Sequence, residues 1–274
     1  MLLRPTLPPS GALSQGEYRS AAAMVPCPWF DEMAAWCGEH PYDVGLHLAP
    51  ASEWRRTCRW GPAGRPRDRV RGLLTHSATS TATWPAWRRP AKADEVAAEI
   101  RAQLARARRL GMKPSHIDTH MGTLYARPDY TRAYLEMAVA EEVPAMVIEM
   151  TPRTVEKFRS QGYPINDEMR KLIADYPLPK LDDFHSVAPA KTYAEKRQKL
   201  FEQVRGLPPG LHEIIFHPSV ETGVGWMLTS ARQPQAGLED RLMADPVVRQ
   251  FWKEQGIVIT DWKEVHTRFK RRGR

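Results

Sequence analysis

Short apolar segments alternate along this chain with longer segments in which apolar residues recur every three or four positions. The short segments predict β-strands near residues 22–25, 43–48, 115–120, 145–149, 213–217 and 257–260. The longer segments predict helices near residues 29–37, 94–110, 129–141, 193–204 and 238–254. Strands separated by helices indicate parallel pairing with crossover helices, and therefore an α/β fold.

The clearest of these helices is the segment 94–110. Asp94 is a plausible N-cap, an apolar residue recurs every four positions from Val96, and Gly111 supplies the stop. Six strand-and-helix units fit a TIM-barrel-like (β/α) barrel, with an open sheet as the alternative. In both folds, ligands bind at the carboxyl ends of the strands.

Four regions depart from this alternation of strands and helices: the two ends of the chain and two internal segments. We expect one barrel-like domain over residues 20–265, preceded by an irregular segment 1–19 and followed by a basic tail 266–274, more a frayed terminus than a binding arm. Residues 55–90 and 151–187 have no sustained period and are expected to be long loops over the strand ends. The first contains several tryptophans, which suit either burial or stacking on a sugar ring, burial being favoured: Trp60, Trp84 and Trp87, with Trp54 just before.

The segment His-Ile-Asp-Thr-His-Met-Gly at residues 116–122 holds the strongest candidate chemistry. In an extended strand, alternate side chains share a face, so His116, Asp118 and His120 are expected to lie together. Two imidazoles and a carboxylate are common metal ligands, although the same pattern also suits a hydrogen-bonded polar patch. Two further histidines, His47 and His217, stand near the ends of other predicted strands. The sequence therefore predicts a shared pocket of strand-end histidines.

Composition narrows the class of protein. The 274 residues carry a net charge of +8, but Lys and Arg are widely spread and no nucleic-acid motif is present, so a solvated basic surface is expected. Three cysteines without a C-x-x-C spacing argue against disulfides or a structural zinc cluster: Cys27, Cys37 and Cys58. Without a long apolar run or a secretory signal, the expectation is a cytoplasmic protein with no membrane or nucleic-acid partner.

Four segments together resemble a known family. They are Asp-Val-Gly-Leu-His-Leu from Asp43, Ser-Glu-Trp from Ser52, Pro-Ser-His-Ile-Asp-Thr-His-Met-Gly from Pro114, and Phe-His-Pro from Phe216. Their order is similar to that in the YdjC-like carbohydrate deacetylases of the ChbG/HpnK type, over roughly residues 20–262. The resemblance implies a β/α-barrel-like fold and metal-dependent removal of the acetyl group from N-acetylated mono- or oligosaccharides.

The resemblance also implies roles for particular residues. His47 and His120 would be the ligands of a divalent ion, zinc or magnesium, and His116 is the weaker ligand candidate. Asp118 would orient a ligand histidine or accept the proton of the attacking water. His217 would protonate the leaving amine, unless it is a structural histidine at its strand end. The oligomeric state is left open, and a homodimer is one candidate.

One departure from the family concerns the N-terminus. The family's first strand ends in an Asp-Asp pair, whereas no Asp precedes Asp31 in this chain. The expectation is a barrel incomplete at this strand, and either a shortened or misread deacetylase or a relative that has lost catalysis. The alternatives are another metal-dependent hydrolase or isomerase on the same fold, and a non-catalytic carbohydrate-binding relative.

Overall fold

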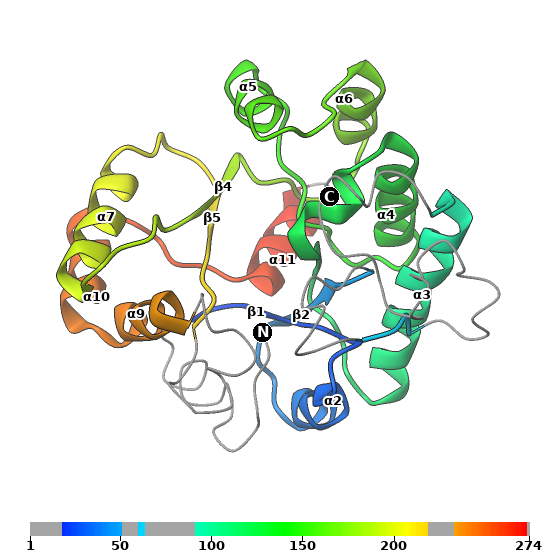
Figure 1. Cartoon of the computed structure of the whole chain (residues 1–274), viewed down its shortest axis with the longest axis horizontal. Helices are drawn as coiled ribbons and strands as arrows, with labels where there is room; N and C mark the ends of the chain where they lie inside the picture. The colour runs from blue at the N-terminus through cyan, green and yellow to red at the C-terminus, as the bar shows by residue number, and fades with distance from the viewer. Residues whose placement is uncertain (1–17, 51–59, 64–90, 219–232, 273–274) are drawn as a thin grey trace. The chain divides into compact units, whose positions relative to one another are not determined.

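The computed structural model describes residues 18–50, 60–63, 91–218 and 233–272 (Figure 1). Two compact units are distinguished. The first comprises Ser20–Lys180 and Trp262–Arg274, and the second comprises Leu181–Asp261 with the described residues Tyr18 and Arg19. Each unit contains a small parallel sheet with helices, so the predicted α/β class is confirmed. The closure of these strands into an incomplete barrel stays a prediction.

The sheet of the first unit has the strand order β1-β2-β3, and its neighbouring strands are parallel. Its strands are β1 (Ala21–Ala23), β2 (Val44–Leu48) and β3 (Ile117–Thr119). In the register, Leu46 lies beside Ala23 on one side and Ile117 on the other. Leu46 and Ile117 are fully buried, as expected for the centre of a parallel sheet. The strands predicted near residues 22, 43 and 115 are therefore present.

The predicted strand 145–149 is wrong as a strand. Ala145 forms an isolated parallel bridge with Ile117, and the pairing does not continue. The bridge consists of two hydrogen bonds, from the N–H of Ile117 to the carbonyl of Pro144 and from the N–H of Met146 to the carbonyl of Ile117. The N–H of Ala145 points away from β3 and donates to the hydroxyl of Tyr176 at 2.7 Å.

Three of the helices in the first unit follow the expected apolar periodicity. They are α2 (Phe30–Glu39), α3 (Ala93–Arg109) and α4 (Pro128–Ala140) (Figure 1). The stripe of Val96, Ile100 and Leu104 on α3 is buried, and Gly111 follows the helix at φ +87°. The N-cap is Lys92 rather than Asp94, because Glu95 accepts the backbone N–H of Lys92 and the helix begins earlier.

The predicted loop 151–187 is wrong, because it contains two helices and a strand. Helix α5 (Pro152–Ser160) begins at a proline after Thr151, whose side chain accepts the N–H of Thr154. Helix α6 (Asp167–Ala174) begins after Asn166, whose side chain accepts the N–H of Met169. Caps and a proline at the first helical position thus define elements too short to show a clear period.

The second unit pairs β4 (Asp183–Ser186) with β5 (His212–Ile215) in parallel. Strand β4 was not predicted. The described helices of this unit are α7 (Tyr193–Arg205), α9 (Gln233–Ala244) and α10 (Pro246–Glu254). Its apolar core contains Val187, Leu200, Val204, Leu242, Met243, Val248 and Phe251.

Three predictions near the C-terminus need correction. Residues 257–260 form no strand and expose Val258 at 76%. The predicted helix 238–254 is two helices, because Asp245 caps α10 and Pro246 occupies its first position. The expected frayed tail is helix α11 (Trp262–Arg272), which packs into the first unit through the buried Trp262.

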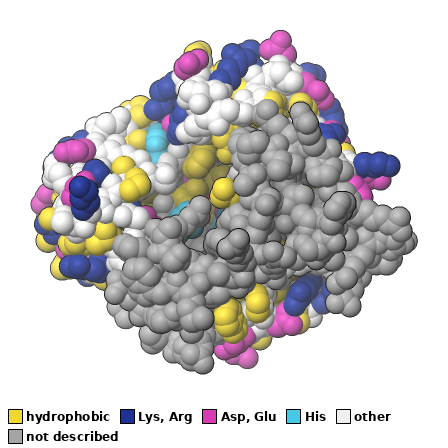
Figure 2. Space-filling view, in the orientation of Figure 1, with side chains coloured by type: hydrophobic (Ala, Val, Ile, Leu, Met, Phe, Trp, Pro, Cys, Tyr) yellow, Lys and Arg dark blue, Asp and Glu magenta, His cyan; other side chains and the backbone are white. Residues whose placement is uncertain are grey.

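The distribution of charge on the surface is relevant to the expectation that the protein has no nucleic-acid partner. Figure 2 shows basic and acidic side chains intermixed over the described part of this face, in keeping with a solvated charged surface. Across the described residues, no helix combines the length and the apolar character needed to cross a membrane.

Candidate functional site

The candidate site begins with two residues that are direct partners in the sheet. His47 on β2 lies beside Asp118 on β3, so their side chains leave the same face. The Nδ1–H of His47 donates to Oδ1 of Asp118 at 2.7 Å. Parallel pairing thus joins a histidine and a carboxylate that lie 71 positions apart in the chain.

His120 adds a second imidazole to this pair. It is the first residue of the 3₁₀ helix η3 (His120–Tyr125), which directly follows β3. Its Nδ1 lies 3.1 Å from Nε2 of His47, and the two ring planes are nearly perpendicular at 80°. The structure therefore brings together His47, Asp118 and His120. We call these three residues the histidine–aspartate cluster.

The electrostatics of this cluster favour an ionised Asp118. Burial alone would raise the pKa of the Asp118 carboxyl, but the charge and hydrogen bond of His47 outweigh burial and lower the pKa. An ionised carboxylate accepts the proton on Nδ1 of His47, so in the neutral form of this imidazole the lone pair is on Nε2, on the His120 side. The side chains of His47 and Asp118 stay 21% and 13% exposed, so the cluster is not sealed from solvent.

A tight turn after His120 directs its ring. Met121 and Gly122 both have positive φ, at 54° and 63°. A Cβ on Gly122 would collide with the hydroxyl of Tyr163, which comes from the segment between α5 and α6. Thr123 closes the turn by donating its hydroxyl proton to the carbonyl of His120 at 2.9 Å. Glycine is needed here both for the left-handed backbone and for the close approach of Tyr163.

His116 lies below the cluster on the same face of the sheet. Its ring occupies the space that a Cβ on Gly45 would need, at 2.6 Å, and alternation places Gly45 on the face of His47. The ring also stacks on Trp262 of α11, with centroids 5.2 Å apart. His116 is 3% exposed and its Nδ1 lies 3.0 Å from the hydroxyl of Ser115, so it packs as part of the floor of the site.

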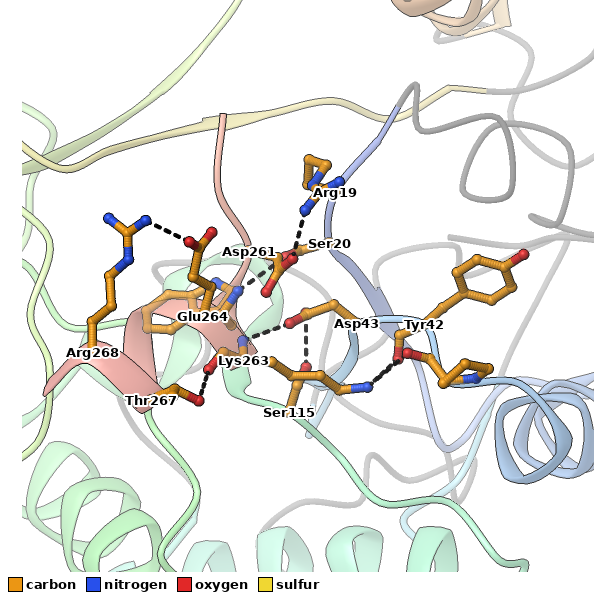
Figure 3. A network of polar contacts seen from close by, with 12 residues as sticks. Arg19, Ser20, Tyr42, Asp43, Ser115, Asp261, Lys263, Glu264, Thr267 and Arg268 are labelled. Carbon is orange, nitrogen blue, oxygen red and sulfur yellow. Dashed lines mark hydrogen bonds and ion pairs between the residues drawn. The ribbon is translucent and has the colours of Figure 1, made fainter. Parts of the chain in front are cut away.

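Asp43 ties the C-terminal helix to this floor (Figure 3). Its carboxylate accepts the hydroxyl of Ser115 at 2.8 Å and the backbone N–H of Lys263, in the first turn of α11, at 2.7 Å. Burial would raise the pKa of Asp43, but hydrogen bonding and charge from His116, with the bonds from Lys263 and Ser115, lower it. An ionised carboxylate also suits the positive end of the helix dipole.

Two buried polar residues of α3 hold the chain around the cluster. Gln103 accepts the backbone N–H of Ala49, just beyond β2, at 3.1 Å. Glu99 accepts the N–H of Ala63 at 2.8 Å. Trp60 is 4% exposed with its ring centroid 6.2 Å from that of His120, which supports burial of this tryptophan. Trp54, Trp84 and Trp87 and most of the predicted loop 55–90 lie outside the described residues.

His217 belongs to the second unit and follows β5. Its side chain is exposed, and its backbone N–H donates to the Oε2 atom of Glu239 at 2.7 Å. Its place relative to the histidine–aspartate cluster stays a prediction.

Two acidic residues that could supply a carboxylate in place of the family's Asp-Asp pair have other partners. Glu149 pairs with Lys180 at 3.3 Å, and Asp261 pairs with Arg19 at 3.1 Å. Over the four described ranges, no group of three His, Cys, Asp or Glu side chains has the geometry of a metal site. The described cluster therefore offers two imidazole nitrogens, and any further ligand has another source.

Sequence reasoning did not identify the residues that support this cluster. Gly45 carried a usable signal, because a glycine inside a buried strand often marks the close approach of another group. Trp262 and Tyr163 carried none, since their contacts with His116 and Gly122 join distant segments of the chain.

The fold and the cluster define an α/β protein with paired imidazoles and a carboxylate at the ends of neighbouring strands. The model of the YdjC-like protein family matches residues 11–254, and the chain therefore belongs to that family. This confirms the resemblance drawn from the sequence motifs.

Two relatives place the chain further. A carbohydrate deacetylase of Thermus thermophilus is 28% identical over 208 residues, covering 75% of this chain and 70% of that protein. The crystal structure of a candidate cellobiose-phosphate cleavage protein from Enterococcus faecalis matches with a TM-score of 0.74 and 17% identity. That match covers 96% of this chain and 94% of the other, and it shows a shared fold.

Proposed function

We propose that this chain is a metal-dependent hydrolase that removes the acetyl group from N-acetylated sugars. The observation that carries the proposal is the 3.1 Å separation of His47 Nε2 and His120 Nδ1, with Asp118 on the far nitrogen of His47. Two nitrogens bound at about 2.1 Å to one tetrahedral ion are about 3.4 Å apart. The observed spacing therefore suits two ligands of one ion, and it equally suits an imidazole–imidazole hydrogen bond.

The residues fit a metal as a partial donor set. A carboxylate on the second nitrogen of a ligand histidine is the usual arrangement at metal sites, because it fixes the tautomer and orients the ring. Asp118 makes this contact with His47. The two imidazoles are neutral ligands, so water, substrate oxygens or residues outside the described ranges would complete the coordination. Zinc and magnesium are both candidates, and imidazole ligands favour zinc.

Hydrolysis of an acetamide consumes one water and yields acetate and a free amine. A divalent ion, when bound, supplies a more acidic water and polarises the acetyl carbonyl. Asp118 keeps Nδ1 of His47 protonated and so holds the ring in its binding orientation. His217, exposed at the end of β5, would give a proton to the leaving nitrogen, because imidazole exchanges protons near neutral pH.

Acetate release and metal content together test the proposal. Purified protein is incubated with zinc or magnesium and a panel of N-acetylated mono- and disaccharides. We expect acetate from at least one sugar, and loss of both activity and bound metal in His47→Ala and His120→Ala. His40→Ala is the matched control, because the ring of His40 lies at the end of α2 and bonds the backbone carbonyl of Trp36. Protein that retains metal yet releases no acetate from any sugar would overturn the deacetylase assignment.

A non-catalytic carbohydrate-binding role is the second candidate. It is favoured by the 3.1 Å separation of His47 Nε2 and His120 Nδ1, which also suits an imidazole–imidazole hydrogen bond that needs no metal. This role predicts that sugar binding, measured by calorimetry, survives His47→Ala and His120→Ala unchanged. The hydrolase predicts weaker binding or lost turnover in the same variants.

A further inference from the structure

The second unit contains a buried lysine that forms an ion pair with a glutamate. Lys196 on α7 is 1% exposed, and its ammonium contacts Oε1 of Glu239 on α9 at 2.7 Å. The ammonium also donates to the carbonyl of Val187, just after β4, at 3.1 Å. Burying an ammonium and a carboxylate is costly, and an apolar pair of similar size often gives equal stability. A charged pair at this position therefore suggests a task other than stability.

Glu239 connects this pair to the candidate proton donor. While Oε1 contacts Lys196, Oε2 accepts the backbone N–H of His217 at 2.7 Å. Strand β5 ends at Ile215, so the ladder with β4 no longer fixes the backbone at residue 217. The carboxylate thus supplies a hydrogen bond where the sheet has stopped supplying one.

Neighbouring contacts hold Glu239 and Lys196 in turn. The hydroxyl of Tyr18 donates to the backbone carbonyl of Glu239 at 3.2 Å. Gln235, one turn earlier on α9, exchanges two hydrogen bonds with the backbone of Ala190 and lies 3.4 Å from the Lys196 ammonium. The segment after β4, the segment after β5 and helix α9 are therefore joined through one charged pair.

We propose that Glu239, with its charge balanced by Lys196, is a positioning residue that fixes the backbone from which the His217 imidazole projects. The proposal rests on the proposed function, in which His217 protonates the leaving amine. The Glu239 carboxylate accepts the backbone N–H of His217, so Glu239 acts through His217. A direct hydrogen bond to a charged group is shorter and stronger than one between neutral groups, which suits a contact that must hold a loop.

The first test is Glu239→Gln, measured by deacetylation kinetics on the metal-loaded protein. An amide cannot serve both as the acceptor for His217 and as the counter-charge of Lys196. We expect kcat to fall at least tenfold with KM changed less than about twofold, because proton delivery rather than sugar binding is disturbed. The basic limb of the pH–kcat profile should also move. Glu202→Gln, on the exposed side of α7, is the control and should leave kcat and the profile unchanged.

A second variant separates positioning from folding. Lys196→Met/Glu239→Met replaces the charged pair by an apolar pair, which should fold but lacks the acceptor for His217. We expect the same loss of kcat as in Glu239→Gln and faster hydrogen exchange at the His217 amide, read by NMR on folded protein. A folded double variant with wild-type kcat and unchanged exchange at this amide would refute the positioning role.

The readouts also distinguish failure of this inference from failure of the proposed function. If His217→Gln abolishes activity while both Glu239 variants keep wild-type kcat, the positioning role is wrong and the proton-donor role stands. If His217→Gln leaves kcat unchanged, the proton-donor role is wrong, and Glu239 then has no catalytic group to position. If no sugar is deacetylated at all, amide exchange at His217 still decides whether Glu239 fixes this backbone.

Discussion

The histidine–aspartate cluster and the Lys196–Glu239 pair use the same kinds of groups in opposite ways. In the cluster, the Asp118 carboxylate bonds the ring of His47 and leaves the second ring nitrogen facing His120. In the pair, the Glu239 carboxylate bonds the backbone of His217 and leaves the ring exposed.

The two regions also differ in burial. The side chains of His47 and Asp118 are 21% and 13% exposed, whereas that of Lys196 is 1% exposed. A carboxylate bonded to one ring nitrogen determines which of the two ring nitrogens can bind a ligand. A carboxylate bonded to a backbone N–H determines the position of the backbone that carries the side chain. A histidine can therefore be positioned by a hydrogen bond to its ring or by a hydrogen bond to its main chain.

The largest expected effect comes from breaking the buried pair on one side. Lys196→Met leaves the Glu239 carboxylate buried without its counter-charge and should lower the free energy of unfolding by about 3–5 kcal/mol. Urea unfolding measures the change. Lys199→Met is the matched control on the same helix, because its ion pair with Glu195 is partly exposed and should contribute far less. Equal effects of the two variants would contradict the importance of burial.

A smaller loss is expected from filling the floor of the histidine–aspartate cluster. In Gly45→Ala, the new Cβ would meet the carbonyl oxygen of His116 at 2.5 Å and its ring at 2.6 Å. We expect a loss of about 1–3 kcal/mol in the free energy of unfolding, together with weaker metal binding, because β3 must shift. Gly38→Ala in α2 is the control, since a Cβ there would meet its nearest neighbour, the carbonyl oxygen of Gly111, only at 3.4 Å. A stable Gly45→Ala protein with normal metal affinity would show that the floor does not position the cluster.

The contribution of Asp118 to metal affinity is the next test. Asp118→Asn keeps the size of the side chain but removes the charge that holds His47 in one tautomer. We expect metal affinity to fall about 10–100-fold, measured by calorimetry at constant pH. Asp175→Asn on the exposed end of α6 is the control and should bind metal normally. Unchanged affinity in Asp118→Asn would assign the carboxylate to catalysis rather than to ligand orientation.

The smallest expected effect is a pH dependence at the base of the cluster. The pKa of Asp43 in the folded protein lies below its ordinary value of 3.8. The unfolded chain therefore binds this proton first as pH falls, so the stability that Asp43 contributes is complete above about pH 4 and lost below it. The stability difference between the wild type and Asp43→Asn should shrink in urea titrations as the pH falls from about 4 towards the lower pKa of the folded carboxyl. A difference that stays constant over this range would contradict the lowered pKa.

The predictability of the fold varied with the length and regularity of the elements. The long amphipathic helix α3 and the buried strand β2 were predicted, because each shows its period over enough residues. The short helices α5 and α6 were missed, since they span only two or three turns and their signals are caps. The apolar residues of 257–260 resembled a strand but lie exposed, because no described strand pairs with them.

The candidate site was predictable in its reactive groups and not in its supports. The spacing of His116, Asp118 and His120 placed three side chains on one face of a strand. His47 was predicted as a site residue because it is a polar residue near the end of a buried strand. The contact of Trp262 with His116 could not be predicted, because the two residues lie far apart in the chain and no helix was predicted over α11. Lys196 resembled any surface lysine of an amphipathic helix.

The sequence by itself determined the long, regularly patterned elements such as α3 and β2 and which segments carry imidazoles and carboxylates, because local periodicity reports which faces are buried. Tertiary structure decided the partners: Asp118 for His47 across 71 positions, Glu239 for Lys196 across 43, and Trp262 for His116. Such pairings depend on strand register and on how helices dock, and both are set by packing between distant segments rather than by the residues adjacent to each group.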